Sequence, residues 1–349
     1  MARLPYTKNI ITETREYTPD EIKMMQEMMK KGPPIKSTIE MERLLWMDED
    51  KVKGAEFYME CIWLWGGKTT SGTTEEPHVH AFPEVIGFIS SDENDPKNLD
   101  ARMEILLGDE THYLTKSCLV FVPPGMKHCP LTFREVNRPV FFFTLAPISH
   151  YGRRSENMKP EEAAKIEIPK FRTPRKDANG SRYARFIVTE PISHIPKNAK
   201  GKAPPPPPRD IKASHIVSLD HSIIPGAFYV DFVWIWNGSM VMAAETHAHD
   251  WDEMIGLVGY PNKKNPREID PGMSVKMGED MYTMEKSSLI YVPKNVMHAP
   301  IIFKDIKKPV LCFTIGTAPK WNKVKAAKTV AKTSAKGAAK AAPKAKKKK

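Results

Sequence analysis

The chain has 349 residues, which is enough for two domains that each bury a core of their own. Its hydrophobic fraction of 41% and its charged fraction of 27% are those of a globular protein. No apolar run approaches the ~20 residues needed to cross a bilayer, and the first residues carry charge every few positions, so we expect a cytoplasmic protein with no membrane partner.

One short helix is predicted near the N-terminus. Thr18 is placed as its N-cap, a proline follows at the first helical position, and Glu21 completes a capping box. The helix should run through a Met-rich stretch to Gly32, where Pro33 and Pro34 stop it.

An internal repeat organises the rest of the chain. Three segments occur twice, 169 to 171 residues apart: 57–65 with 228–236, 78–87 with 247–256, and 117–130 with 287–300. The match begins earlier, because Tyr6–Glu13 resembles Tyr183–Glu190. Each half therefore starts with an extended arm, which we expect to pack on the other half.

Within each half the segments are short, rich in β-branched and aromatic residues, and bounded by Gly, Pro and Asn. This pattern predicts an all-β sandwich or barrel in each half. The predicted divisions are a first barrel with its arm and helix (1–150), a linker (151–182), a second barrel with its own arm (183–321) and a tail (322–349). The second division includes a stiff poly-Pro spacer at 204–208. The cysteines are expected to be buried free thiols: Cys61, Cys118, Cys129 and Cys312.

The tail accounts for the net charge of +11, because residues 322–349 hold eleven lysines and no acidic residue. With few large apolar groups it should be disordered. A polycation of this kind binds phosphate backbones through counterion release, which suggests weak, non-specific binding to nucleic acid or polyphosphate. A solvated tail without a specific partner is the alternative.

Each half also carries a His-x-His-x₃-Glu motif followed by a third histidine. On a strand, His78 and His80 would project to the same side, where both can reach one ion. Glu84 would lie ~13 Å further along a continuing strand, so the chain must turn before it. The turn at Pro123–Gly125 can aim His128 at the same point.

These residues resemble the two motifs of the cupin superfamily, in its two-barrel (bicupin) branch. Gly72 and the four residues above match in the first half, as do His247, His249, Glu253 and His298 in the second. The departures touch turns and not ligands: Ser117, Asn295, Thr132 and Ile302. The resemblance covers about residues 38–148 and 211–319, and implies tandem double-stranded β-helix barrels with one divalent metal ion in each.

Three imidazoles and one carboxylate leave two positions of an octahedral ion open. Manganese or iron suits this donor set best, with zinc, nickel, cobalt and copper as alternatives. The resemblance implies an enzyme that forms a homo-oligomer, as such proteins do. It would bind a small oxygenated compound: a hydroxy or keto acid, a phenol or a β-dicarbonyl. Dioxygenation and O₂-independent hydrolysis or lysis both stay open.

Four further residues are candidates for proton chemistry. Glu60 and Asp231 occupy equivalent positions in apolar strands, either behind the metal histidines or at a strand end facing water. His112 and Tyr282 align across the repeat and are either acid–base groups or partly buried polar residues. The alternative to an enzyme is a metal-dependent binding or storage protein whose tail attaches it to nucleic acid or polyphosphate.

Overall fold

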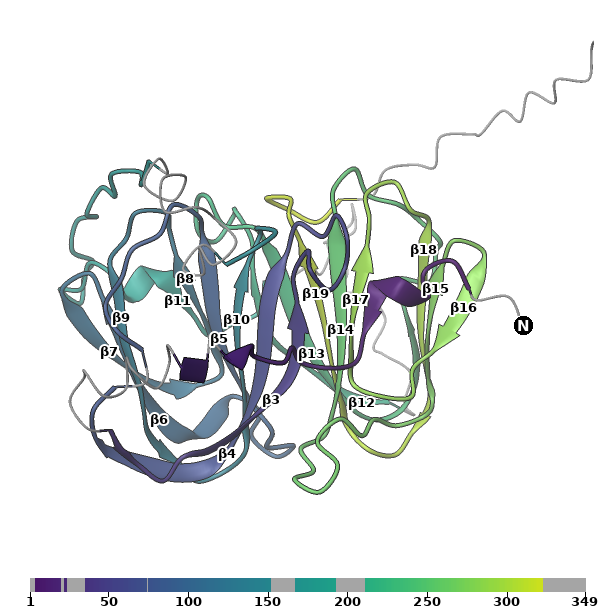
Figure 1. Cartoon of the computed structure of the whole chain (residues 1–349), viewed down its shortest axis with the longest axis horizontal. Coiled ribbons are helices and arrows are strands. Elements are labelled where there is room, and N and C mark those ends of the chain that lie inside the picture. The colour runs from purple at the N-terminus through teal and green to yellow at the C-terminus, as the bar shows by residue number, and fades with distance from the viewer. Residues whose placement is uncertain are drawn as a thin grey trace, which may run out of the picture.

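The computed structural model describes residues 4–19, 22–23, 35–73, 75–151, 167–192 and 211–322. Two curled antiparallel sheets lie side by side, each closing into a barrel (Figure 1). The expected tandem of two all-β barrels is therefore confirmed, and its two halves follow the internal repeat.

The first barrel is a ten-stranded sheet in the order β11-β8-β5-β10-β4-β9-β6-β7, with β2 and β3 also paired to β4. Its strands are β2 (Lys36–Ser37), β3 (Glu40–Met47), β4 (Tyr58–Ser71), β5 (Glu84–Ser90), β6 (Asn98–Leu107), β7 (Glu110–Lys116), β8 (Cys118–Val122), β9 (His128–Val136), β10 (Val140–Ala146) and β11 (Ile187–Val188).

The second barrel is a nine-stranded sheet in the order β1-β17-β14-β19-β13-β18-β15-β16, with β12 also paired to β13. Its strands are β1 (Ile10–Ile11), β12 (Lys212–Leu219), β13 (Tyr229–Met242), β14 (Glu253–Gly259), β15 (Met273–Met277), β16 (Asp280–Thr283), β17 (Ser288–Val292), β18 (His298–Ile306) and β19 (Val310–Gly316). Two short 3₁₀ helices, η1 (Thr7–Asn9) and η2 (Ala184–Phe186), precede β1 and β11.

The long strand β4 joins the two walls of the first barrel. Its first half pairs with β10, and after Gly66 it pairs with β9. Gly67 has a φ of +117°, and a Cβ added there would lie 2.2 Å from the carbonyl oxygen of Thr38. The strand can therefore bend across the barrel at this position only with a glycine.

Each arm lies on the opposite barrel, as expected. Strand β1 pairs with β17, with Ile10 opposite Ile290, and β11 pairs with β8, with Ile187 opposite Val120. In Figure 1 the purple N-terminal segment accordingly lies against the second barrel. The two barrels are therefore joined by an exchange of strands as well as by the chain between them.

Aromatic side chains fill the contact between the barrels. Phe232 of β13 stacks on Phe143 of β10 at 4.8 Å between ring centroids, and on Phe313 of β19 at 4.7 Å. The buried indole of Trp234 donates a 2.8 Å hydrogen bond to the carbonyl oxygen of Ser90 in the other barrel. One continuous apolar core thus includes residues from both halves.

Other predicted features are only partly described. The amide of Ile22 donates to the carbonyl oxygen of Thr18 at 3.0 Å, as the first turn of the predicted helix requires. Residues 20–21 and 24–34 of that predicted helix lie outside the described residues. So do residues 152–166 of the linker, the poly-Pro run and the tail from residue 323, and the domain boundaries stay predictions. All four cysteines are buried free thiols, as expected. No helix in the described ranges is long and apolar enough to span a membrane.

Candidate metal centres

The first barrel brings its four predicted ligands together. His78 pairs with His128, the first residue of β9, through two backbone hydrogen bonds of 3.0 and 3.1 Å. The chain bends after His80, so that Glu84 opens the next strand, β5. One potential ligand atom from each of the four side chains lies within 4.8 Å of the others. The glutamate and two of the histidines are buried, which keeps water away from most of the centre.

The second barrel repeats this arrangement with one difference in spacing. The ligand atoms of His247, His249 and His298 lie within 4.8 Å of one another. Glu253 reaches the group from β14, with its Oε2 atom 2.8 Å from Nε2 of His298 and 3.7 Å from Nε2 of His249. The two groups fit one metal ion in each barrel.

All six imidazoles are oriented by the backbone. Each Nδ1 atom faces a carbonyl oxygen, which can only accept, so Nδ1 carries the proton and Nε2 keeps its lone pair. The acceptors are Glu76 for His78, Phe82 for His80, Met126 for His128, Glu245 for His247, Asn322 for His249 and Val296 for His298. For the five other than His249 the distances are 2.7 to 3.1 Å. Imidazoles bound this way are prepared to coordinate a metal through Nε2.

The centres of both groups are buried and electron-rich. The Nε2 atoms of His128, His249 and His298 and the Oε2 atom of Glu253 are buried, and within the described residues they find no well-aligned hydrogen bond. With Nδ1 protonated, Nε2 of His298 presents a lone pair to the Glu253 oxygen 2.8 Å away. Only a cation, either a proton or a metal ion, makes such a contact favourable, so the residues present fit a bound metal.

Burial and mutual contacts shift the pKa values of these groups. Burial would raise the pKa of Glu84, but its contacts with His128 and His80 hold the pKa far below the ordinary value. Burial lowers the pKa of His78 and of His249 to about 4. Burial would also lower the pKa of His298, but the adjacent Glu253 carboxylate outweighs it and raises that pKa.

These shifts predict how the metal-free protein responds to acid. Between pH 6.5 and about 4, the unfolded chain binds protons at His78 and His249 that the folded chain excludes, so stability falls as the pH falls. The raised pKa of His298 acts in the opposite direction, but it is one group against two. Urea unfolding of chelator-treated protein should therefore show a lower midpoint at pH 4.5 than at pH 7. Equal midpoints would contradict this prediction.

Aromatic side chains line both centres. Phe82 stacks on His80 at 4.1 Å, and Trp251 stacks on His249 at 4.0 Å. Each half has one further aromatic residue near its centre, shortly after β10 or β19, that the sequence analysis did not identify as part of the site. Tyr151 places its hydroxyl 3.4 Å from Nε2 of His78, and the ring of Trp321 lies edge-on to His249 at 5.8 Å. Their common position in the repeat, 170 residues apart, was the available signal.

Glu60 and Asp231 do not contact the metal-site histidines. Glu60 forms a 2.5 Å ion pair with Arg43 of β3, and Asp231 pairs with His215 of β12. Arg43 and His215 are themselves equivalent in the repeat. Tyr229 lies beside Asp231, with its hydroxyl 3.5 Å from that carboxylate, and burial, followed by the charge of Asp231, raises the pKa of Tyr229. A catalytic role for either acid stays a prediction.

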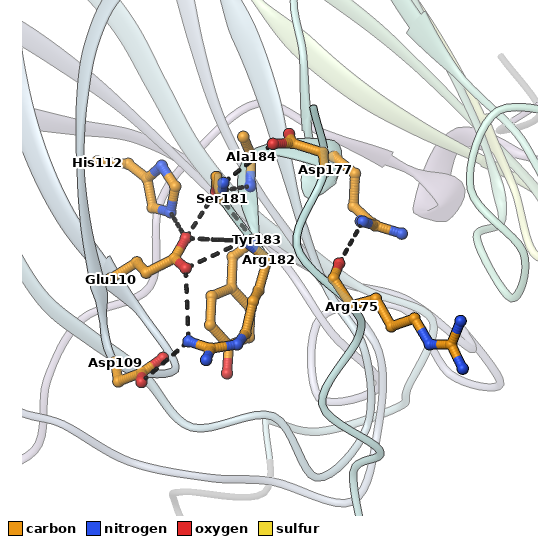
Figure 2. A network of polar contacts seen from close by, with 10 residues as sticks. Asp109, Glu110, His112, Arg175, Asp177, Ser181, Arg182, Tyr183 and Ala184 are labelled. Atoms are coloured by element: carbon orange, nitrogen blue, oxygen red, sulfur yellow. Dashed lines mark hydrogen bonds and ion pairs between the residues drawn. The ribbon is translucent and has the colours of Figure 1, made fainter. Parts of the chain in front are cut away.

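His112 and Tyr282 lie where the arms dock. In Figure 2, His112 points toward Glu110, with 3.8 Å between Nε2 and the carboxylate, and Glu110 accepts hydrogen bonds from Ser181 and the Arg182 amide, directly before the second arm. The hydroxyl of Tyr282 accepts from the amide of Tyr6 at 2.9 Å. Their alignment across the repeat thus reflects two equivalent docking sites, and acid–base catalysis by them stays a prediction.

Comparison with known proteins gives matches only among solved structures. No protein-family model and no curated protein matches the chain. A mutant of Bacillus subtilis oxalate decarboxylase is similar over 83% of this chain and 76% of its own, with 12% identity and a TM-score of 0.48. The formate complex of Lactobacillus farciminis oxalate decarboxylase is similar over 84% of this chain and 88% of its own, with 13% identity and a TM-score of 0.45.

Proposed function

We propose that the protein is a metal-dependent enzyme that holds one divalent ion in each barrel and acts on a small oxygenated organic compound. The observation that carries the proposal is the orientation of the six imidazoles. Every Nδ1 faces a backbone carbonyl oxygen, which leaves Nε2 atoms converging beside a buried glutamate. Two such centres in one chain are difficult to explain as packing, because each keeps buried polar atoms without well-aligned hydrogen bonds.

The ligands we propose are those that the sequence predicted: His78, His80, Glu84 and His128 in the first barrel, and His247, His249, Glu253 and His298 in the second. Manganese or iron suits this donor set best, with zinc, nickel, cobalt and copper as alternatives. When bound, the ion supplies Lewis acidity toward an anionic carboxylate, α-hydroxy acid or enolised β-dicarbonyl, or reactivity with O₂ if it is redox-active.

Tyr151 is the residue we propose to assist the substrate in the first barrel. Burial, and then the charge of Glu84, raise the pKa of its hydroxyl, so the phenol stays protonated at neutral pH. A protonated phenol beside the centre can donate a hydrogen bond to a substrate oxygen that gains negative charge during the reaction. Trp321, at the equivalent position of the second barrel, has no oxygen. We therefore favour the first barrel as the place of the reaction.

A substrate panel tests the proposal and separates its two mechanisms. Protein loaded with Mn²⁺ or Fe²⁺ would be incubated with catechols, hydroxybenzoates, hydroxy acids and β-diketones, with oxygen uptake followed in air and products analysed without oxygen. Turnover that a chelator removes and the same metal restores is the expected result. Products formed only in air would assign dioxygenation, and anaerobic products would assign hydrolysis or lysis. Tight binding of a panel compound without turnover would support a binding protein instead.

Tyr151→Phe is expected to lower kcat by about 100-fold, a typical effect of losing one hydrogen bond to developing charge. The ring contacts with Tyr58, Phe82 and His80 are retained, so metal content should not change. Steady-state kinetics on a substrate from the panel would measure the effect. Tyr113→Phe is the matched control, since that tyrosine is 62% exposed on β7. Equal kcat for the Tyr151→Phe and Tyr113→Phe variants would remove Tyr151 from the mechanism.

A further inference from the structure

The two barrels hold their second histidine in different ways. In the first barrel, Nδ1–H of His80 donates to the carbonyl oxygen of Phe82, two residues further along the same loop, at 2.7 Å. In the second barrel, Nδ1–H of His249 donates instead to the carbonyl oxygen of Asn322, 73 residues further along the chain. The orientation of this imidazole therefore depends on the segment that follows the last strand of the barrel.

Asn322 is itself fixed by the residue that stacks on His249. Its side-chain Oδ1 accepts a 2.6 Å hydrogen bond from the indole Nε1 of Trp251. The Trp251 ring lies on the His249 imidazole with 4.0 Å between centroids and 17° between planes. These three residues form a closed set of contacts, in which Trp251 touches the histidine with its face and the asparagine with its N–H.

Trp321 adds a second contact from the same segment. Its ring is edge-on to His247 at 5.9 Å and to His249 at 5.8 Å. Among the residues that the structure describes, the first barrel has no equivalent of the whole set. Phe82 stacks on His80 as Trp251 stacks on His249, but a phenyl ring has no N–H with which to hold a neighbouring segment.

We propose that Asn322 is a positioning residue for the metal of the second barrel, and that Trp251, Trp321 and Asn322 form a clasp that makes metal affinity there depend on the C-terminal segment. The inference rests on the proposed function, because it assumes a metal at His249. Its physical basis is that the acceptor opposite Nδ1 sets both the tautomer and the rotation of a ligating imidazole. Asn322→Ala keeps the backbone carbonyl but removes the side-chain oxygen through which Trp251 holds this segment, so the carbonyl is no longer fixed opposite Nδ1 of His249. Loss of such an acceptor typically weakens metal binding by about 10- to 100-fold.

The test uses full-length protein in which only one centre remains. His80→Ala disables the first centre and leaves the second, and His249→Ala does the reverse. Asn322→Ala is added to each, and Mn²⁺ and Zn²⁺ are titrated separately into the metal-free proteins. In the His80→Ala protein we expect Asn322→Ala to raise the Kd at least 10-fold, and in the His249→Ala protein we expect no change.

Two further variants separate positioning from general damage. Asn322→Asp keeps an acceptor oxygen for the Trp251 indole and should recover the affinity. Trp251→Phe keeps the ring stack on His249 but removes the indole N–H, so it should weaken metal binding by itself. Adding Asn322→Ala to Trp251→Phe should then weaken metal binding little further. Circular dichroism would verify that every variant is folded.

If Asn322→Ala left the Kd of the second centre unchanged, or weakened metal binding equally at both centres, the proposed clasp would be wrong. The metal sites themselves would not be affected by that result. A folded His80→Ala protein that binds neither ion would overturn the second metal site itself, and this inference with it. The two failures are thus distinguishable in one set of titrations.

Discussion

His80→Ala and His249→Ala should each lower the metal content from near two ions per chain to near one, and the double variant should hold none. Each imidazole is buried, held by its Nδ1 proton and stacked on an aromatic ring, so no nearby side chain can replace its Nε2 atom. With one of four protein ligands lost, the remaining three hold a divalent ion much less tightly. Elemental analysis of protein purified without chelator measures this directly.

The matched control for this experiment is His150→Ala. His150 is 41% exposed and forms ion pairs with Glu49 and Asp50, and it is not one of the proposed ligands, so its removal should leave the metal content unchanged. If the His80→Ala and His249→Ala proteins both kept near two ions per chain, the assignment of the centres would be wrong. A loss confined to one variant would restrict the metal to that barrel.

Gly256→Ala is expected to destabilise the fold by at least about 1–3 kcal/mol, the usual cost of overpacking a filled core. A Cβ at this position would lie 1.9 Å from Cζ of Phe313, and one at the equivalent Gly87 would lie 2.0 Å from Cζ of Phe143. Neither ring can move aside, because both stack on Phe232 in the contact between the barrels. The glycine three residues after the metal-site glutamate thus makes room for this contact. Urea unfolding with metal bound would measure the loss.

A smaller side chain at Phe313 tests whether contact with this ring is what makes Gly256→Ala destabilising. Phe313→Leu should itself destabilise the protein, because it leaves space in a packed core. Combined with Gly256→Ala, it should cost less than the sum of the two single changes, since the new methyl group fills that space. Additive effects in the double variant would show that the methyl group and the Phe313 ring do not compete for the same volume.

The repeat made most of the fold predictable from the sequence. Strand-sized segments recurring in order around His-x-His-x₃-Glu indicated two equivalent barrels, and the need for a turn before Glu84 placed it on the next strand, where β5 begins. Such patterns are local, because they depend on strand periodicity and turn residues. The arms were predictable as repeated segments for the same reason.

The surroundings of the centres were not predictable to the same extent. The partners of Glu60 and Asp231 are contributed by β3 and β12, and this pairing depends on strand register and not on local pattern. His112 and Tyr282 looked equivalent in the sequence, but the sequence could not tell that a docked arm causes the equivalence. Asn322 reaches His249 across 73 residues, a contact that only the closed barrel brings about.

The reciprocal pairing of the arms determines how firmly the two halves of the chain are held together. Two separate copies of a single barrel that traded their N-terminal strands would make the same contacts as β1 with β17 and β11 with β8. Such a strand-exchanged homodimer dissociates on dilution, as any two-chain complex does. Fusion of the two copies makes both exchanges intramolecular, at an effective concentration that dilution cannot change. The single chain thus has the form of a strand-exchanged dimer without its dependence on protein concentration.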